Sequence, residues 1–206
     1  MTSLAVHSIG PSVTIQDRGR VGFVVSGLSQ GGAVDMRALA EGAALLGQSG
    51  DLAALEMAGF GGTFVADHDI RIALTGAVMQ ASLDGVPLQW NASHAVPRGA
   101  ELRIGSAASG GYGYLHVGGG IDAPLVMGAR SAHLNSQIGA RLLDGAVLPI
   151  GADPGTAVNR RLDGAVRDVG GAIRLVRSFQ TNLFAPDELH RFEQTVFHRD
   201  MRGNRM

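Results

Sequence analysis

The sequence predicts a mainly β protein, a barrel or sandwich of short strands with one helix embedded among them. Many short runs with strand-like alternation follow one another at roughly regular spacing, which is typical of all-β folds. Glycine supplies 31 of the 206 residues, about twice its usual share of roughly 7%. Because no G-X-Y period or Ser/Gln-rich tract accompanies these glycines, we interpret them as turns between strands.

The expected strands are separated by turn residues along the first 150 positions. The strongest local signal is Asp84-Gly85, a pair that favours a two-residue type I′ hairpin. Residues 97–99 and 118–120 mark two further breaks. Strands are expected at residues 3–9, 14–15, 21–25, 52–58, 63–66, 70–74, 79–83, 86–90, 101–104, 112–117 and 146–150.

One helix is expected within this region, from residue 34 or 35 to residue 46. Asp35 is placed as its N-cap or first-turn acid, and Gly47 stands where a left-handed C-terminal cap would. Apolar residues recur at helical spacing along one face, namely Met36, Leu39, Ala43 and Leu46.

The composition predicts a division of the chain into a first β domain (1–151), a linker (152–171) and the beginning of a second β domain (172–206). Asp, Arg, Gly and Pro without periodicity fill the linker region. Beyond it we expect a strand at 172–176 and a helix at 186–197. Because so short a segment cannot close a core alone, we expect the second domain to be incomplete.

Charge and composition exclude several classes of function. A formal net charge of −1, without blocks of like charge, argues against nucleic acid or an anionic membrane as partner. The absence of Cys excludes disulfides and thiolate sites, and the absence of Lys excludes a Walker phosphate loop, Schiff-base chemistry and covalent biotin on this chain. With no basic-apolar leader and no run of about 18 apolar residues, a cytoplasmic protein is expected.

Residues 10–35 are the leading candidate for a site. Glycines surround the polar run Gln16-Asp17-Arg18-Gly19-Arg20, and this composition suggests backbone brought close to a ligand or to another backbone. Glu56 lies in an apolar strand, where a carboxylate needs a partner. Arg20 is the expected partner, since a bidentate pair suits a buried setting. Tyr114 is either a hydrogen-bonded core residue or part of a site.

Two further motifs have competing interpretations. Residues 27–31 match the G-x-S-x-G pattern and place Ser29 as a hydrolase nucleophile, but the expected helix begins too late for a nucleophile elbow, which favours a glycine-rich turn. The seven histidines are scattered without ligand spacing, so no metal site is expected.

The order of motifs resembles the biotin-dependent carboxyltransferase family, which includes the C subunit of 5-oxoprolinase, allophanate hydrolase subunit 2 and the antagonist of the sporulation kinase inhibitor. The resemblance covers most of residues 3–150 and fades beyond residue 176. It is carried by Gly10-Pro11, Thr14-Ile15-Gln16-Asp17, Gly19-Arg20, Gly22, Gly27-Leu28-Ser29, Gly32-Ala33, Asp35, Leu46-Gly47, Ala53-Ala54-Leu55-Glu56, Leu83-Asp84-Gly85, Tyr114-Leu115, Gly119-Gly120-Ile121-Asp122 and Gly128-Ala129-Arg130-Ser131.

The resemblance implies two tandem cyclophilin-like β-barrel domains that work with a smaller partner subunit. The implied substrate is a small amide or lactam, either 5-oxoproline opened to glutamate with ATP or urea carboxylated from carboxybiotin. ATP or carboxybiotin would reside on partner subunits. The candidate catalytic residues are Gln16, Asp17, Arg20, Glu56 and Tyr114, and the candidate substrate-binding residues are Gly19, Ser29, Gly119, Gly120, Arg130 and Ser131.

This sequence departs from the family's usual pattern at a few positions, and three functions remain open. Ala129, Ala132-His133 and Glu41-Gly42-Ala43 replace more usual residues, and family members are longer. The chain is therefore expected to be a subunit of a 5-oxoprolinase or carboxyltransferase, a non-catalytic protein that acts by binding a partner, or a hydrolase that uses Ser29.

Overall fold

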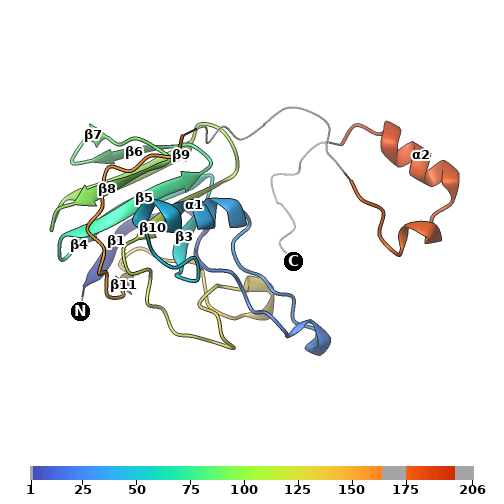
Figure 1. Ribbon diagram of the computed structural model, residues 1–206, viewed down its shortest axis with the longest axis horizontal. Helices are drawn as coiled ribbons and strands as arrows, with labels where there is room; N and C mark the ends of the chain where they lie inside the picture. Colours follow the sequence, from blue (N-terminus) through green and yellow to red (C-terminus); the bar gives the residue numbers. More distant parts are fainter. Residues whose placement is uncertain (1, 164–174, 198–206) are drawn as a thin grey trace. The chain divides into compact units, whose positions relative to one another are not determined.

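Figure 1 shows the computed structural model of the chain, which describes residues 2–163 and 175–197. These residues form two compact units, 2–163 and 175–197, and each is described by itself. The elements of the first unit are β1 (Ser3–Ile9), β2 (Val13–Gln16), η1 (Val24–Ser26), α1 (Met36–Leu46), β3 (Ala54–Ala58), β4 (Phe60–Ala66), β5 (Ile70–Gly76), β6 (Met79–Leu83), β7 (Val86–Pro87), β8 (Ala92–Val96), β9 (Glu101–Ala107), β10 (Tyr112–Val117), η2 (Leu134–Ser136) and β11 (Val147–Pro149).

The strands of the first unit form two antiparallel sheets. The first sheet has the order β11-β1-β4-β9-β6-β7, and the second has the order β2-β3-β10-β5-β8. The mainly β class with one embedded helix is therefore confirmed. Among the described residues neither sheet closes on itself, so the strands do not complete a barrel.

The main core lies between the two sheets. Alternate side chains of each strand point inward, because successive residues of a strand face opposite sides. Each such apolar side chain contributes roughly 1.5–3 kcal/mol when it is fully buried. The core includes Leu4, Val6, Phe64, Leu102 and Ile104 from the first sheet and Leu55, Met57, Ile72, Leu74 and Leu115 from the second.

Helix α1 covers the outer face of the second sheet (Figure 1). Its buried residues Leu39 and Leu46 pack toward Tyr114 of β10 and Ala73 of β5, respectively. Strand β5 is consequently buried along its whole length, with the main core on one face and the helix on the other.

The helix ends confirm the expected caps. Asp35 accepts a hydrogen bond at Oδ1 from the backbone N–H of Ala38, 2.9 Å away, as an N-cap should. Gly47 has a φ of 65° and donates its N–H to Ala43 and Ala44. These two residues fix where α1 begins and ends.

A buried histidine lies between β10 and α1. Thr75 donates its hydroxyl hydrogen to the Ala38 carbonyl and lies 3.0 Å from His116 Nε2. The hydroxyl oxygen must therefore accept a hydrogen bond from Nε2–H. Burial lowers the pKa of His116 from 6.5 to about 4. Gly42 of α1 leaves the space for this ring, because a Cβ there would lie 2.1 Å from His116.

Two local predictions are corrected by the structure. The predicted strand at 21–25 is wrong, since the segment is a turn followed by η1 (Figure 1). Its apolar side chains lack a partner strand and are exposed, at 77% for Val21 and 100% for Val25. The predicted strand at 86–90 ends at Pro87, and β8 at Ala92–Val96 was not predicted because its polar residues hide the alternation.

The predicted hairpin at Asp84-Gly85 is confirmed. These residues have φ values of 48° and 81°, the left-handed values that a type I′ turn requires. Leu83 pairs with Val86 directly across the turn.

Residues 152–162, from the predicted linker, belong to the first unit and contact its strands. Arg71 of β5 binds both carboxylate oxygens of Asp153, at 2.8 and 2.6 Å, and also donates to the Leu46 carbonyl. Further along, the N–H of Ser93 in β8 donates to the Arg160 carbonyl, and the N–H of Arg160 donates to Ser93 Oγ. The pKa of Asp153 is lowered by its hydrogen bonds to Arg71. The predicted domain boundaries themselves stay a prediction.

The second unit contains η3 (Thr181–Leu183) and α2 (Pro186–Gln194). The predicted helix over 186–197 is therefore correct in place but ends earlier. The predicted strand at 172–176 lies mostly outside the described residues, and the described Leu175 and Val176 are not in a strand. No residue of 175–197 is buried.

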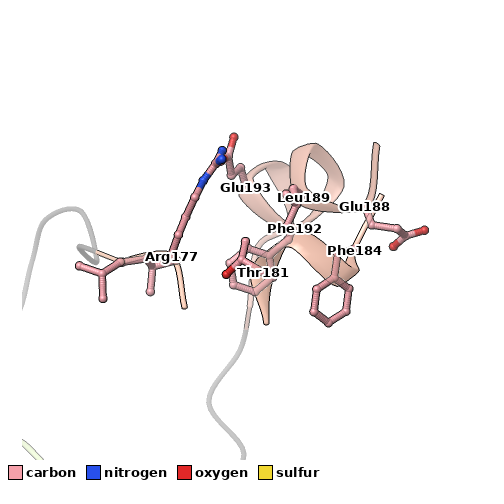
Figure 2. Close-up of a pocket in the computed structure, with 9 residues that line it drawn as sticks. Arg177, Thr181, Phe184, Glu188, Leu189, Phe192 and Glu193 are labelled. Atoms are coloured by element: carbon pink, nitrogen blue, oxygen red, sulfur yellow. The ribbon is translucent and has the colours of Figure 1, made fainter. Parts of the chain in front are cut away.

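A groove of about 480 Å³ runs along α2 (Figure 2), lined by Leu175, Val176, Arg177, Thr181, Phe184, Glu188, Leu189, Phe192 and Glu193.

Candidate functional site

Two segments that are distant in the chain interlock to form the candidate site. The first is the glycine-rich segment 16–35, and the second is the short segment 130–133. Each of the four residues in the second segment bonds to the first. The pairs are Asp17 with Arg130, Arg20 with Ser131, Gln16 with Ala132, and Ser29 with His133.

Glycines allow the first segment to cross itself at close range. Arg20 donates its N–H to Gln30, and Ala33 donates its N–H to Asp17, so the loop between them is closed at its base. Gly19 has a φ of 81°, and a Cβ there would lie 2.6 Å from the Gln30 carbonyl oxygen. The crossing therefore requires glycine, as the sequence suggested.

Asp17 holds the two segments together. Its side chain accepts a hydrogen bond at Oδ1 from the Gly19 N–H, 2.9 Å away, and at Oδ2 from the Arg130 N–H, 2.6 Å away. The residue is 6% exposed. Because both carboxylate oxygens already bind backbone donors, Asp17 shapes the site rather than standing ready as a general base.

Arg20 is the largest fully buried side chain of the described residues, with 1% exposure. Its Nε donates to the Val126 carbonyl at 3.0 Å, and its Nη1 donates to Ser131 Oγ at 3.1 Å. No carboxylate in the described part of the chain forms an ion pair with it. The predicted pairing of Arg20 with Glu56 is therefore wrong.

A tight hairpin presents the carbonyl that Arg20 uses. Val126 and Ala129 exchange two backbone hydrogen bonds across Met127 and Gly128, whose φ values are 53° and 80°. Such values define a type I′ turn. The hairpin thus turns the carbonyl of Val126 toward Arg20 and leads directly into segment 130–133.

Glu56 and Tyr114 form a separate network that anchors the start of α1. Tyr114 donates its hydroxyl hydrogen to Glu56 Oε2 at 2.6 Å, and the N–H of Val34 donates to the same oxygen at 2.7 Å. The N–H of Asp35 donates to the Tyr114 hydroxyl oxygen at 2.8 Å. These contacts give Glu56 and Tyr114 a role in positioning the segment before the helix.

Gln16 contributes one unsatisfied polar atom. Its Nε2 donates to Thr14 Oγ1 at 3.0 Å and to the Ala132 carbonyl at 3.2 Å. Its Oε1 is buried and has no hydrogen-bond partner among the described residues. A buried acceptor without a partner is costly, so this oxygen is available to a ligand that carries an N–H group.

Ser29 does contact a histidine, but the hydrogen bond runs the wrong way for a nucleophile. Ser29 Oγ lies 2.8 Å from His133 Nε2. The N–H of Ser136 donates to His133 Nδ1 at 3.3 Å, which assigns the ring hydrogen of a neutral His133 to Nε2. Nε2 therefore donates to Ser29 and cannot accept its proton.

Gly119 and Gly120 pack against other parts of the chain, away from the two interlocked segments. A Cβ on Gly119 would lie 2.2 Å from the Gly151 carbonyl oxygen, and a Cβ on Gly120 would lie 2.8 Å from Leu52. Gly119 also donates its N–H to Gln48 Oε1. Their positive φ values serve a close crossing of chains.

Arg130 is only partly engaged. Its Nη2 binds Asp122 Oδ1 at 2.6 Å on the surface, and its Nε is buried without a hydrogen-bond partner among the described residues. His133, which was not predicted as a site residue, is joined to Ser29 and packs against Gly31. The signal that could have found it was its position directly after the Arg130-Ser131 motif.

Within residues 2–163 and 175–197, no three His, Asp or Glu side chains gather as metal ligands would. The same residues contain no helix that is long and apolar enough to cross a membrane.

The fold and the site together define an open two-sheet β domain whose polar groups are held by two interlocked loops. A family model for the carboxyltransferase domain, subdomain A and B, matches residues 26–206. The chain belongs to this carboxyltransferase family.

The similar proteins of known name come from two enzyme systems. The C subunit of 5-oxoprolinase from Escherichia coli (strain K12) is 40% identical over 152 residues, which cover 72% of this chain and 49% of that protein. Urea amidolyase of Lachancea kluyveri is 31% identical over 147 residues, which cover 71% of this chain and 8% of that protein. The matched region thus spans about half the length of the 5-oxoprolinase protein.

A solved structure confirms the fold. The crystal structure of TTHA0988 in space group P212121 superposes with a TM-score of 0.83 and 28% sequence identity. The superposition covers 92% of this chain and 38% of that one.

Proposed function

We propose that this chain is a subunit of an ATP-dependent 5-oxoprolinase, which opens 5-oxoproline to glutamate together with a smaller partner subunit. The similarity to the C subunit of a 5-oxoprolinase supports this assignment. The relatives of that name are subunits, which supports a partner for this chain as well.

The single observation that carries the proposal is the interlocked site. Two segments place a charged guanidinium and several hydrogen-bonding groups in an almost water-free position, with Arg20 and Ser131 each 1% exposed. Attack on a lactam or amide carbonyl develops an oxyanion, and donors act on it more strongly where water is excluded.

Exposed apolar side chains around the site support a partner subunit. Arg20 lies at the base of a loop that carries Val24 and Val25, and these side chains are 69% and 100% exposed. The hairpin that Arg20 contacts carries Leu125 and Met127 at 59% and 43%. We call these four residues the apolar rim. Apolar side chains grouped on neighbouring loops are typical of a surface that another protein covers.

Urea carboxylation is the second candidate, because the urea amidolyase of L. kluyveri is also similar. In that case the site would receive the carboxyl group of carboxybiotin. The 206 residues contain no Lys on which biotin could be attached, so biotin would be carried outside them.

Reconstitution with partner subunits tests the proposal. The chain is co-expressed with the candidate partners, and glutamate formation from 5-oxoproline is measured with and without ATP. A parallel assay supplies urea, ATP and bicarbonate. ATP-dependent glutamate formation is expected from the wild-type complex, with a strong loss in Asp17→Ala.

Asp51→Asn is the matched control for this assay. Asp51 is an exposed acid, and it pairs with Arg18, an exposed residue of segment 16–35. It is expected to retain the wild-type rate. Carboxylation of urea instead of 5-oxoproline cleavage would replace the proposal by the second candidate. A stable complex without turnover of either substrate would make the chain a non-catalytic binding protein.

A further inference from the structure

We propose that Arg20 and Ser131 form a binding site for the carboxylate group of a small ligand. The inference rests on the proposed function and deepens it, because it names the substrate group that this site would hold. It applies to the free chain as well as to the assembled enzyme.

The first argument is the missing counter-ion of Arg20. An arginine is permanently charged, and an ionised group taken out of water is unfavourable unless an opposite charge accompanies it. The two acceptors of Arg20 are the neutral Val126 carbonyl and the neutral Ser131 hydroxyl. The guanidinium therefore has hydrogen bonds in the described structure, but its charge is not balanced.

The acids in the neighbourhood are already used elsewhere. Asp17 lies three positions before Arg20, yet its oxygens bind the backbone of Gly19 and Arg130. Glu56 binds Tyr114 and the N–H of Val34. The protein thus keeps both carboxylates in other hydrogen bonds, which is the arrangement expected when the counter-charge comes from a ligand.

The second argument is the set of donors that remain. Arg20 uses Nε and Nη1 within the protein, and no described residue accepts a hydrogen bond from Nη2. Ser131 Oγ accepts from Nη1, so its own hydrogen is available, and no described residue accepts it either. One guanidinium nitrogen and one hydroxyl are a suitable pair of donors for the two oxygens of a carboxylate.

The third argument concerns the rest of the ligand. Gln16 Oε1 is a buried acceptor without a partner among the described residues, and Gln16 binds Ala132, the residue after Ser131. A ligand with a carboxylate and a nearby amide N–H would satisfy both kinds of unpaired group. 5-Oxoproline carries both groups on one small ring, whereas urea carries no carboxylate.

Binding to the purified full chain tests the proposal with three probes. L-5-oxoproline has the carboxylate and the lactam, 2-pyrrolidinone has the lactam ring alone, and acetate has the carboxylate alone. Calorimetric titration and the ligand-dependent rise in Tm are measured for each probe. We expect binding of 5-oxoproline, weaker binding of acetate and none of 2-pyrrolidinone.

Variants locate the site. Ser131→Ala removes one neutral donor and is expected to weaken 5-oxoproline binding about tenfold, and Arg20→Gln about a hundredfold. Arg18→Gln is the matched control, since Arg18 is exposed and paired with Asp51. It is expected to bind as the wild type does. If Arg20→Gln does not fold, 5-oxoproline binding by Ser131→Ala alone decides whether the inference holds.

Three results would overturn the inference: equal binding of 5-oxoproline and 2-pyrrolidinone, no loss in Ser131→Ala, or no binding of any carboxylate by either the chain or its assembled complex. The turnover assay separates this outcome from the proposed function. Carboxylate binding without turnover would support the proposed site and contradict the proposed function. Turnover by Ser131→Ala with a wild-type KM for 5-oxoproline would support the proposed function and contradict the proposed site.

Discussion

The Asp17 carboxylate accepts a hydrogen bond from the backbone N–H of Arg130 at 2.6 Å, across 113 positions of sequence. The contact joins the glycine-rich loop before α1 to the segment that follows the type I′ hairpin at Met127 and Gly128. One side chain thereby ties together the two parts of the candidate site.

Replacing Asp17 by Ala is expected to destabilise the fold by about 3 kcal/mol, because two part-buried backbone donors lose their acceptor at roughly 1–3 kcal/mol each. Urea denaturation followed by circular dichroism measures the change. Asp51→Asn, at an exposed position, is expected to change stability by less than about 0.5 kcal/mol. Equal stability of wild type and Asp17→Ala would contradict the interlock.

Replacing Gly42 by Ala is expected to destabilise the protein, although alanine is the better helix former. The added Cβ would lie 2.1 Å from the His116 ring, so the ring must move, at a cost of about 1–3 kcal/mol. The double variant Gly42→Ala/His116→Ala has room for the new methyl group. The double variant should therefore lose less stability than the sum of the losses of the two single variants. A double-mutant cycle measures this difference. Strict additivity would argue against the contact.

The stability of the wild type is expected to fall as the pH drops from 6.5 toward 4. Since burial lowers the pKa of His116 to about 4 in the folded protein, the unfolded chain binds more protons in this window. The loss from this group amounts to about 3 kcal/mol by pH 4 and levels off within about one further pH unit. In His116→Gln, which keeps a donor for Thr75, the difference between pH 6.5 and 4 should shrink by this amount. Parallel pH curves for the two proteins would refute the buried neutral ring.

Fluorophosphonate probes are expected to leave Ser29 unlabelled. A nucleophilic serine needs a base that accepts its proton, and His133 Nε2 instead donates to it. Mass spectrometry of the intact chain after probe treatment measures labelling, with trypsin as the positive control for the reagent. Labelling that disappears in Ser29→Ala would revive the hydrolase hypothesis.

Features that depend on neighbouring residues could be predicted from the sequence. Asp35 and Gly47 mark the ends of α1 because a cap acts within one turn of its own helix. The Asp84-Gly85 turn likewise depends on two adjacent residues. The apolar run 21–25 misled the prediction, because nothing in its own composition shows that no strand lies beside it.

The contacts of the site could only partly be predicted. Gln16, Asp17 and Arg20 stood out by composition, and Arg130 and Ser131 by family resemblance, and the structure joins both groups. The partner expected for Arg20 was wrong, since matching charges cannot reveal that Glu56 already binds Tyr114. Its real partner, the carbonyl of Val126, is a backbone atom and leaves no trace in the sequence.

The backbone crossing at Gly19 lets the loop tip and the buried groups change independently. Two hydrogen bonds close the loop at its base, and a Cβ at Gly22 or Gly27 would meet no other atom. Substitutions or short insertions around Val25 therefore leave Asp17 and Arg20 where they are. In evolution, the outer surface of this loop can acquire a new neighbour while the chemistry beneath it stays the same. In the laboratory, a substitution at Val24 or Val25 of the apolar rim can therefore test partner binding without moving the buried groups.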